Sequence, residues 1–415
     1  MAHQARLRIC LLSYRSNPHC GGQGVYLRNL SRALKDLGHH VEVVSGPPDP
    51  ILDDDIPVHS LASLDLYNPD DLFRIPSLKE LSNPVNMIEW LQVATLGFPE
   101  PFTFGLRAWA FLKNRLHQYD VIHDNQSLSY GLTWLNRSIP VVCTIHHPIT
   151  RDLDIAVETV SAFWKKIKHL RWYSFIRMQK RVADSFSKLV TVSECSRDDI
   201  CADFKIAQDR FEIVPNGIDI NLFYPIKEIE REKNRIIVTN SADMPLKGLY
   251  HLLFAVAHMA KTTDIQLTVI GTPKKNGAVE NLVRSLDIGH LITFTGRVDH
   301  EEFVRHYARA SVAVIPSLYE GFGLPAGEAM ACGVPVVSTT GGALPEVVGD
   351  AGILVPPGDH IALADGILKL LNNKELAKKL GEAGYRRVHK MFTWKAAAQK
   401  TVETYREAIR DHSRF

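Results

Sequence analysis

The first half of the chain alternates short, continuously apolar segments with amphipathic ones. Residues 6–13 (RLRICLLS) and 41–46 (VEVVSG) predict buried strands, and GGQGVYLRNLSRALKDLGHH between them predicts a glycine-opened amphipathic helix. Further apolar runs follow at residues 119–124, 139–147 and 188–194. Because these runs are continuous rather than alternating, they are typical of parallel strands with helices on both faces. The first half therefore predicts an α/β domain.

The second half repeats this pattern after a charged, apolar-poor run, IKEIEREKN, at residues 226–234. Strand-like segments RIIVTNS, IQLTVIG, LITFTGRV, VAVIPS and PVVST alternate with helical ones, and long helical patterns follow Asp359. We expect two Rossmann-like α/β domains over residues 1–225 and 226–395, and a C-terminal helix over residues 396–415. Two such domains facing across a cleft place the carboxyl ends of their strands, where ligands bind, at a shared crevice.

Two segments of the first half do not follow the alternation. Residues 66–118 are rich in proline and aromatic side chains, which indicates an elaboration of the kind that shapes substrate pockets. The acidic run Asp53 to Asp55 resembles an acidic motif that binds divalent ions, but no strand precedes it closely. We interpret it as a solvated loop and expect no metal site.

Composition limits the class of protein. With 415 residues, 45% hydrophobic and 23% charged, the chain has the composition of a globular protein and the length for two domains. A net charge of +2 gives no reason to expect nucleic acid as a partner. The six cysteines are far apart, which favours reduced thiols. The N-terminal apolar run is too short for a signal peptide, so we expect a cytoplasmic protein.

The stretch SLYEGFGLPAGEAMACGVPVV carries the clearest candidate chemistry. It follows a predicted strand and passes through a glycine-rich turn into a helix whose first turn holds a proline. Backbone N–H groups after Gly321 and Gly323 lie at this helix N-terminus, an arrangement that binds phosphate. On spacing alone, an equally good interpretation is that Glu328 complements the helix dipole and Glu320 lies in solvent.

These residues resemble a known family. The runs EGFGLP, EAMACG and PVV look like the signature of the retaining family 4 glycosyltransferases, whose GT-B type fold is two Rossmann-like domains. The resemblance covers nearly the whole chain except residues 46–118, and we also expect the C-terminal helix to return to the first domain. Other matching parts, in the family's order, are Gly21 and Gly22, PNGID from Pro215, Lys247 of LKG, and GGALPEVV.

The resemblance implies roles around a nucleotide-sugar donor. In the family the first glutamate, Glu320, contacts sugar hydroxyls near the reacting carbon, and the second, Glu328, holds both ribose hydroxyls, which a carboxylate can accept. Lys247 matches the lysine that pairs with the diphosphate leaving group. Family members often carry an arginine six residues earlier, where this chain has Ser241, so Arg297 is a candidate second cation. The implied donor-binding residues are Gly21, Gly22, Ser241, Lys247, Arg297, Val298, Glu320, Gly321, Phe322, Gly323, Leu324 and Glu328.

Histidines of the first domain complete the implied site. His146 in TIHHP aligns with the family histidine beside the sugar and diphosphate, so the implied catalytic residues are His146, Glu320 and Lys247. An ordinary imidazole pKa lets such a group donate a proton to the leaving phosphate near neutral pH, although a histidine at a strand end is often only structural. The segment HDNQS also ends a predicted strand. The candidate acceptor residues are His123, Asn125 and His147.

Residues 161–186 predict a basic amphipathic helix. Its apolar positions are near helical spacing, and seven lysines and arginines surround them. One interpretation is a helix packed on the first sheet with a basic solvent face. The other is peripheral contact with anionic lipid on the inner face of a membrane, since many relatives in the family glycosylate lipids.

Together these observations predict a retaining, metal-independent hexosyltransferase. We expect the donor to be a UDP-sugar rather than a GDP-sugar, the acceptor to be a hydroxyl group of a lipid or saccharide, and no cofactor, because the nucleotide sugar is a substrate. The alternatives are a sugar phosphorylase or epimerase of the same fold, and a catalytically silent nucleotide-sugar-binding subunit. A nicotinamide-dependent dehydrogenase fits poorly, because HCGGQG lacks the full glycine spacing of the dinucleotide fingerprint.

Overall fold

The computed structural model describes residues 6–17, 22–68, 71, 74–158, 160–239 and 244–413. Their packing forms two compact units. The first unit runs to Val192, resumes over Arg197–Val214 and ends with the segment from Trp394, and the second comprises Ser193–Ser196 and Pro215–Thr393. Compact packing does not by itself define a domain that folds alone. The domain boundaries expected from the sequence therefore stay a prediction.

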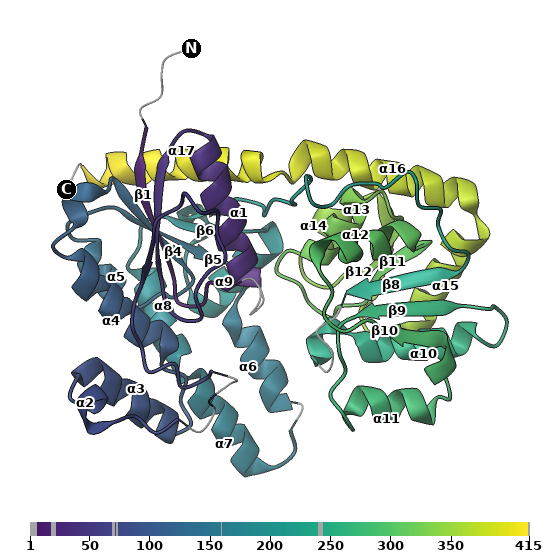
Figure 1. Cartoon of the computed structure of the whole chain (residues 1–415), viewed down its shortest axis with the longest axis horizontal. Helices are drawn as coiled ribbons and strands as arrows, with labels where there is room; N and C mark the ends of the chain where they lie inside the picture. Colours follow the sequence, from purple (N-terminus) through teal and green to yellow (C-terminus); the bar gives the residue numbers. More distant parts are fainter. Residues whose placement is uncertain are drawn as a thin grey trace. The chain divides into compact units, whose positions relative to one another are not determined.

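The first unit is built on a seven-stranded parallel sheet with the order β3-β2-β1-β4-β5-β6-β7 (Figure 1). In register, Ile9 of β1, the third strand in this order, lies between Val41 of β2 and Val121 of β4. The strands are β1 (Arg8–Ser13), β2 (His40–Ser45), β3 (Val58–Ser60), β4 (Val121–Asn125), β5 (Val141–Ile145), β6 (Leu189–Thr191) and β7 (Phe211–Ile213).

Both faces of this sheet are buried. Along β1, Ile9 and Leu11 belong to one cluster of core side chains, whereas Cys10 and Leu12 belong to another on the opposite face. Successive strand side chains point to opposite faces, so a strand covered on both sides is apolar at most of its positions. This is the physical reason for the continuous apolar runs, and the predicted parallel α/β arrangement is confirmed.

The last helix, α17 (Trp394–His412), packs against α1 (Gly22–Asp36) in the first unit. Buried Tyr405 and Ala398 of α17 share a core cluster with Leu27 and Leu30 of α1. Figure 1 shows the yellow C-terminal helix beside the purple N-terminal one. The expected return of the C-terminal helix to the first domain is confirmed.

The other helical segments of the first half surround the sheet or extend from it. They are α2 (Leu78–Leu81), α3 (Pro84–Ala94), α4 (Glu100–Leu112), η2 (Leu116–Gln118), α5 (Tyr130–Leu135), α6 (Ile149–Glu158), α7 (Phe163–Trp172), η3 (Tyr173–Phe175), α8 (Ile176–Asp184), α9 (Glu194–Phe204) and η4 (Gln208–Arg210). The expected elaboration over residues 66–118 consists of α2 to α4 and η2, and Phe104 and Leu112 of α4 enter the core.

The single amphipathic helix expected over residues 161–186 is wrong. The segment breaks into α7 and α8 around the short η3. Helix α8 buries Met178 and Val182, whereas α7 buries none of its residues. Apolar positions at helical spacing can share one face, but tertiary packing covers only the second part of that face.

The second unit contains a six-stranded parallel sheet with the order β10-β9-β8-β11-β12-β13. Its strands are β8 (Arg235–Thr239), β9 (Gln266–Ile270), β10 (Ile292–Phe294), β11 (Val312–Ile315), β12 (Val336–Thr339) and β13 (Gly352–Val355). Its helical segments are η5 (Pro245–Lys247), α10 (Leu249–Met259), α11 (Ala278–Ser285), η6 (Gly289–Leu291), α12 (His300–Arg309), α13 (Leu324–Ala331), α14 (Leu344–Val348), α15 (His360–Asn372) and α16 (Lys374–Met391).

Two sequence-wide expectations can be compared with these elements. The cysteines within the described residues, Cys10, Cys143, Cys195, Cys201 and Cys332, are free thiols. Within the same residues, every helix is too short or too polar to cross a membrane.

Candidate active site

Three loops of the second unit meet at one edge of its sheet. They follow the carboxyl ends of β8, β11 and β12, which are parallel neighbours. Lys247 lies after β8, Glu320 after β11, and Gly342 after β12. A parallel sheet brings such loops together because all its strands end at the same edge, which is where ligands bind in α/β folds.

Glu320 is held by two donors from different loops. Lys247 Nζ donates to Glu320 Oε1 at 2.8 Å, and Ser317 Oγ donates to the same oxygen at 2.8 Å. The Glu320 side chain is 11% exposed and that of Lys247 is 31% exposed. Within the described residues, Oε2 of Glu320 accepts no hydrogen bond. The carboxylate is thus fixed through one oxygen and can accept a ligand hydroxyl through the other.

Glycines let the turn around Glu320 close on itself. The backbone oxygen of Glu320 accepts from Ala343 N at 2.8 Å, and a Cβ on Gly342 would lie 2.2 Å from that oxygen. Gly323, at φ 97°, is the N-cap of α13, and no side chain in the described part of the chain caps this helix. Uncapped amides at a helix N-terminus favour an anion. The turn therefore has the local structure that the sequence predicted for phosphate binding.

Glu328 lies on α13, half-buried, three residues beyond Pro325. Burial raises the pKa of its carboxyl from 4.5 to about 7. Within the described residues this carboxylate makes no hydrogen bond or ion pair. Burial favours the neutral form, and hydrogen bonds from a ligand diol would favour the charged form again.

The other expected donor residues lie in different surroundings. Gly21 and Ser241 fall outside the described residues. Gly22 is the first residue of α1. Arg297, which is exposed, and Val298, which is half-buried, follow β10, the edge strand of the second sheet. Within the turn itself, Phe322 is buried with its ring 5.5 Å from that of Phe392, and Gly321 and Leu324 flank the N-terminus of α13.

His146 of the first unit is held by Asn125. His146 follows β5, Asn125 ends the neighbouring β4, and His146 Nε2 lies 2.7 Å from Asn125 Oδ1. Asn125 Nδ2 donates to the Gln23 carbonyl at 3.1 Å, which fixes its amide orientation. Because Oδ1 can only accept, the network assigns the imidazole proton to Nε2.

Burial lowers the pKa of His146 from 6.5 to about 3, with His147 and His123 as smaller causes. The expectation that this imidazole has an ordinary pKa and donates a proton near neutral pH is therefore wrong for the free protein. His146 is neutral there and offers hydrogen bonds rather than a proton.

Sequence reasoning missed the residue that holds the histidine pair. Gln126, at φ 59°, accepts from His146 N through Oε1 at 2.8 Å and donates to the His147 carbonyl through Nε2 at 3.3 Å. Gln179 donates to the Gln126 carbonyl at 3.2 Å. A left-handed backbone at a non-glycine residue often marks a functional loop, but it is not visible in the sequence. Only the segment HDNQS as a whole could be singled out.

The three candidate acceptor residues differ in access. His123 is buried, with Nδ1 against the Tyr405 hydroxyl and Nε2 2.6 Å from Thr144 Oγ1. Both ring nitrogens make contacts inside the unit, so we do not propose His123 as an acceptor-binding residue. Asn125 is also buried and bonds His146. His147 is half-buried and pairs through Nε2 with Asp152 at 2.8 Å.

The fold and these loops define a class of protein. Two parallel Rossmann-like sheets with the last helix packed on the first unit form the GT-B fold of glycosyltransferases. Residues 223–387 match the family described as glycosyl transferases group 1, and residues 20–222 match glycosyltransferase family 4. The chain belongs to this retaining glycosyltransferase family.

Two relatives match along almost the whole chain. An MMP alpha-(1->4)-mannosyltransferase of Mycolicibacterium hassiacum is 46% identical over 97% of this chain and 98% of its own length. A D-inositol 3-phosphate glycosyltransferase of Corynebacterium diphtheriae is 27% identical over 97% of this chain and 95% of its own.

Solved structures agree with the fold. A sucrose-phosphate synthase of Thermosynechococcus elongatus has a TM-score of 0.73 and 26% identity, covering 98% of this chain and 100% of its own. Anabaena HepE in complex with UDP-glucose has a TM-score of 0.70 and 17% identity, covering 97% and 100%. At that identity, the second structure supports the fold alone.

Proposed function

We propose that this chain is a mannosyltransferase that moves a mannosyl group from a nucleoside diphosphate to a hydroxyl group of a mannose-containing saccharide, with retention at the anomeric carbon. The observation that carries the proposal is the 46% identity, over nearly the full length of both chains, to a relative named for α-(1→4)-mannosyl transfer to MMP, a methylmannose polysaccharide. The site geometry supports the class of reaction.

Residues of the second unit suit the donor. In the proposed complex, Lys247 binds the diphosphate, and Glu320 accepts a sugar hydroxyl through Oε2 while Ser317 holds its other oxygen. Glu328 accepts the two ribose hydroxyls, which its unpaired carboxylate favours. The uncapped N-terminus of α13 adds backbone donors for phosphate. A fixed negative charge at Glu320 also stabilises a sugar ring that becomes positive in the transition state.

The transfer step in this proposal needs no carboxylate nucleophile. The acceptor oxygen forms the new bond to the anomeric carbon on the face from which the diphosphate leaves, and a diphosphate oxygen takes the acceptor proton. Lys247 offsets the charge that develops on the diphosphate. His146, neutral and oriented by Asn125, contributes a hydrogen bond beside the sugar and diphosphate.

The test of the proposed function compares two donor nucleotides in the presence of a saccharide acceptor. Purified protein is incubated with UDP-mannose or GDP-mannose and an α-linked mannose oligosaccharide. Nucleoside diphosphate release and product mass are measured, and the new linkage is determined by NMR. We expect acceptor-dependent release and one added hexose in an α-(1→4) linkage, as in the relative's name. The expectation of uridine as the base stays a prediction that the two donors decide.

Controls separate the proposal from its alternatives. A reaction without the saccharide measures hydrolysis, and mannose 1-phosphate formed from the oligosaccharide and inorganic phosphate would indicate a phosphorylase. If neither donor releases its nucleoside diphosphate with any mannoside, and neither shifts the melting temperature, the assignment to donor transfer is overturned. Donor binding without turnover would instead indicate the silent subunit.

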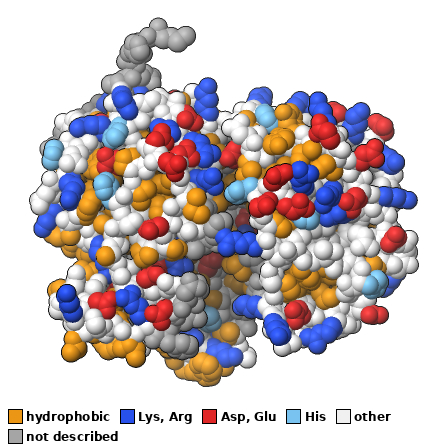
Figure 2. Space-filling model, in the orientation of Figure 1, with side chains coloured by type: hydrophobic (Ala, Val, Ile, Leu, Met, Phe, Trp, Pro, Cys, Tyr) orange, Lys and Arg blue, Asp and Glu red, His pale blue; other side chains and the backbone are white. Residues whose placement is uncertain are grey.

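A lipid acceptor is the second candidate, and one observation favours it. Helix α7 exposes four large apolar side chains and carries Lys165, Lys166, Lys168 and Arg171. Their exposed fractions are 77% for Phe163, 65% for Trp164, 50% for Ile167 and 54% for Leu170. Figure 2 shows hydrophobic side chains at the lower surface of the first unit, where Figure 1 places α2, α3 and α7. This basic apolar surface suits an anionic membrane.

A further inference from the structure

The second unit contains a cavity that includes none of the expected donor residues. Its volume is about 1170 Å³. Residues just before three neighbouring strands line it: Asn234 before β8, Ser311 before β11 and Pro335 before β12. Because the strands are parallel, this amino-terminal edge lies opposite to the edge that carries Lys247 and Glu320. The cavity is therefore separate from the proposed donor site.

Positive charge dominates the lining of this cavity. Among the described residues that line it, Glu382 is the only acidic one, and it pairs with Arg386 at 3.6 Å. The other cationic lining residues make no ion pair with any part of the chain that the structure describes. They are Lys227, Arg231, Lys233, Lys374 and Lys378. Like charges gathered in a hollow raise the local concentration of anions.

The Arg231 guanidinium is fixed in place. Its Nη1 donates to the Ala310 carbonyl at 2.6 Å and its Nη2 to the Gly333 carbonyl at 2.8 Å. A guanidinium has five N–H donors, so bonds to two neutral carbonyls orient it without neutralising it. Its remaining donors and its full charge stay available to an anion.

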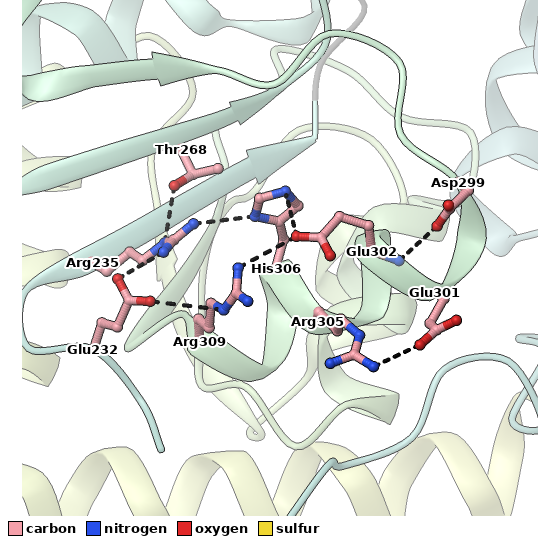
Figure 3. A network of polar contacts seen from close by, with 9 residues as sticks. All are labelled: Glu232, Arg235, Thr268, Asp299, Glu301, Glu302, Arg305, His306 and Arg309. Carbon is pink, nitrogen blue, oxygen red and sulfur yellow. Dashed lines mark hydrogen bonds and ion pairs between the residues drawn. The ribbon is translucent and has the colours of Figure 1, made fainter. Parts of the chain in front are cut away.

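A network of ion pairs engages an acidic side chain of the segment that leads into β8 (Figure 3). Glu232 lies between Arg231 and Lys233 in the sequence, but its carboxylate accepts from Arg235 Nη1 at 2.7 Å and lies 3.9 Å from Arg309 Nε. Its backbone N–H also donates to the Arg309 carbonyl at 2.8 Å. The network thus anchors the segment that carries Arg231 and Lys233. It also pairs the Glu232 carboxylate with arginines that do not line the cavity.

The rest of the lining suits a ligand with a ring. Tyr224 and Tyr385 contribute aromatic side chains, and Leu370 contributes apolar surface. Lys374 and Lys378 come from the start of α16, where the helix dipole also favours negative charge. Aromatic faces stack on nucleobases and on the apolar faces of sugars, and lysine and arginine bind phosphate.

We propose that this cavity is a second ligand site, which binds a phosphorylated compound carrying a nucleobase or sugar ring. The shared chemistry is one or more phosphate groups held by Arg231 and the four lysines, with a ring against the tyrosines. The site goes beyond the proposed transfer reaction, because it lies at the other edge of the sheet.

The test uses charge reversal at Lys374→Glu together with Lys378→Glu. The matched control is Lys369→Glu with Lys379→Glu, two exposed lysines on α15 and α16 that do not line the cavity. Both pairs are made in the full chain that also carries Lys247→Ala, which weakens the proposed donor site. Isothermal titration calorimetry measures binding of inorganic pyrophosphate, GDP and mannose 1-phosphate, and melting temperatures check folding.

The expected result is binding that the cavity reversal weakens by about tenfold or more, while the control changes it by less than about threefold. Tighter binding of GDP than of pyrophosphate identifies a nucleotide as the ligand, and tighter binding of mannose 1-phosphate identifies a phosphorylated sugar. Equal affinities for all probes in the reversed and control proteins, or no binding to either, overturn the proposal.

Discussion

Lys247 and Glu320 are 73 positions apart in the sequence, and their Nζ and Oε1 atoms meet at 2.8 Å. The parallel order of β8 and β11 brings them together, since each residue follows the carboxyl end of one of these strands. In the proposed complex a diphosphate competes with Glu320 for the ammonium group. Donor binding then frees the Glu320 oxygen that Lys247 occupies, which couples diphosphate recognition to recognition of the sugar.

Replacing Lys247 tests this coupling. We expect Lys247→Ala to lower kcat/KM by about 10²- to 10³-fold, because the leaving diphosphate loses a cation. Steady-state release of the nucleoside diphosphate measures it. Lys261→Ala removes an exposed lysine of the same unit and serves as control. Equal kcat/KM values in both variants would remove Lys247 from the site.

Glu328→Gln should separate stability from donor binding. Burial raises the pKa of Glu328 from 4.5 to about 7, so the folded state binds a proton that the unfolded state has lost between these values. Stability of the unaltered protein therefore falls as pH rises through this window. We expect the glutamine variant to be more stable above pH 7 by about 1–3 kcal/mol, and nearly equal below 4.5. Urea unfolding measures it.

The same variant should bind the donor less tightly. A neutral amide accepts more weakly than a carboxylate, and we expect the donor Kd to rise by about tenfold at pH 8. In the unaltered protein, donor affinity should decline as pH falls below about 7, whereas it should stay flat in the variant. An unchanged donor Kd at pH 8 would rule Glu328 out as the ribose ligand.

His146 should remain neutral across the working range. Burial places its pKa at about 3, so its imidazole NMR signals should not titrate between about pH 5 and 8. In urea, where the surroundings are lost, the same ring should titrate near its ordinary value of 6.5. A titration near neutral pH in the folded protein would contradict the neutral role and restore His146 as an acid.

Gly342→Ala should strain the turn that carries Glu320. A Cβ at this position would lie 2.2 Å from the Glu320 carbonyl oxygen, and the residue has a φ of 63°. We expect a loss of about 1–3 kcal/mol in unfolding free energy together with weaker donor binding. Gly289→Ala is the control, because its added Cβ would make only an ordinary contact, 3.7 Å from a Val283 methyl group. Unfolding by urea and donor titration measure both effects.

The exposed apolar side chains and basic residues of α7 predict that the protein binds anionic vesicles. Trp164→Glu with Ile167→Glu should abolish flotation with vesicles of anionic phospholipid, because each change places a charge in the apolar contact. Met391→Glu, on another exposed apolar side chain, is the control. If the unaltered protein does not float with these vesicles, the membrane proposal fails and the saccharide acceptor stands alone.

The α/β class, the longer strands and the return of the last helix could be predicted from the sequence. Continuous apolar runs are typical of strands in a sheet that is covered on both faces. Glycines together with a proline indicate the turn before α13. The edge strands β3 and β7 were missed, because their exposed and half-buried positions carry no continuous apolar run. The split between α7 and α8 was missed because spacing shows which side chains could share a face, not which ones are covered.

By itself, the sequence determined the fold class and the local chemistry of the glycine turn, because these depend on residues that are near one another in the chain. Only the tertiary structure decided the states of the site residues. It brought Lys247 into contact with Glu320. It buried Glu328 and His146 enough that both favour their neutral forms. It also engaged both ring nitrogens of His123 in internal hydrogen bonds. Burial and long-range pairing fix charge, and both arise only when distant segments pack together.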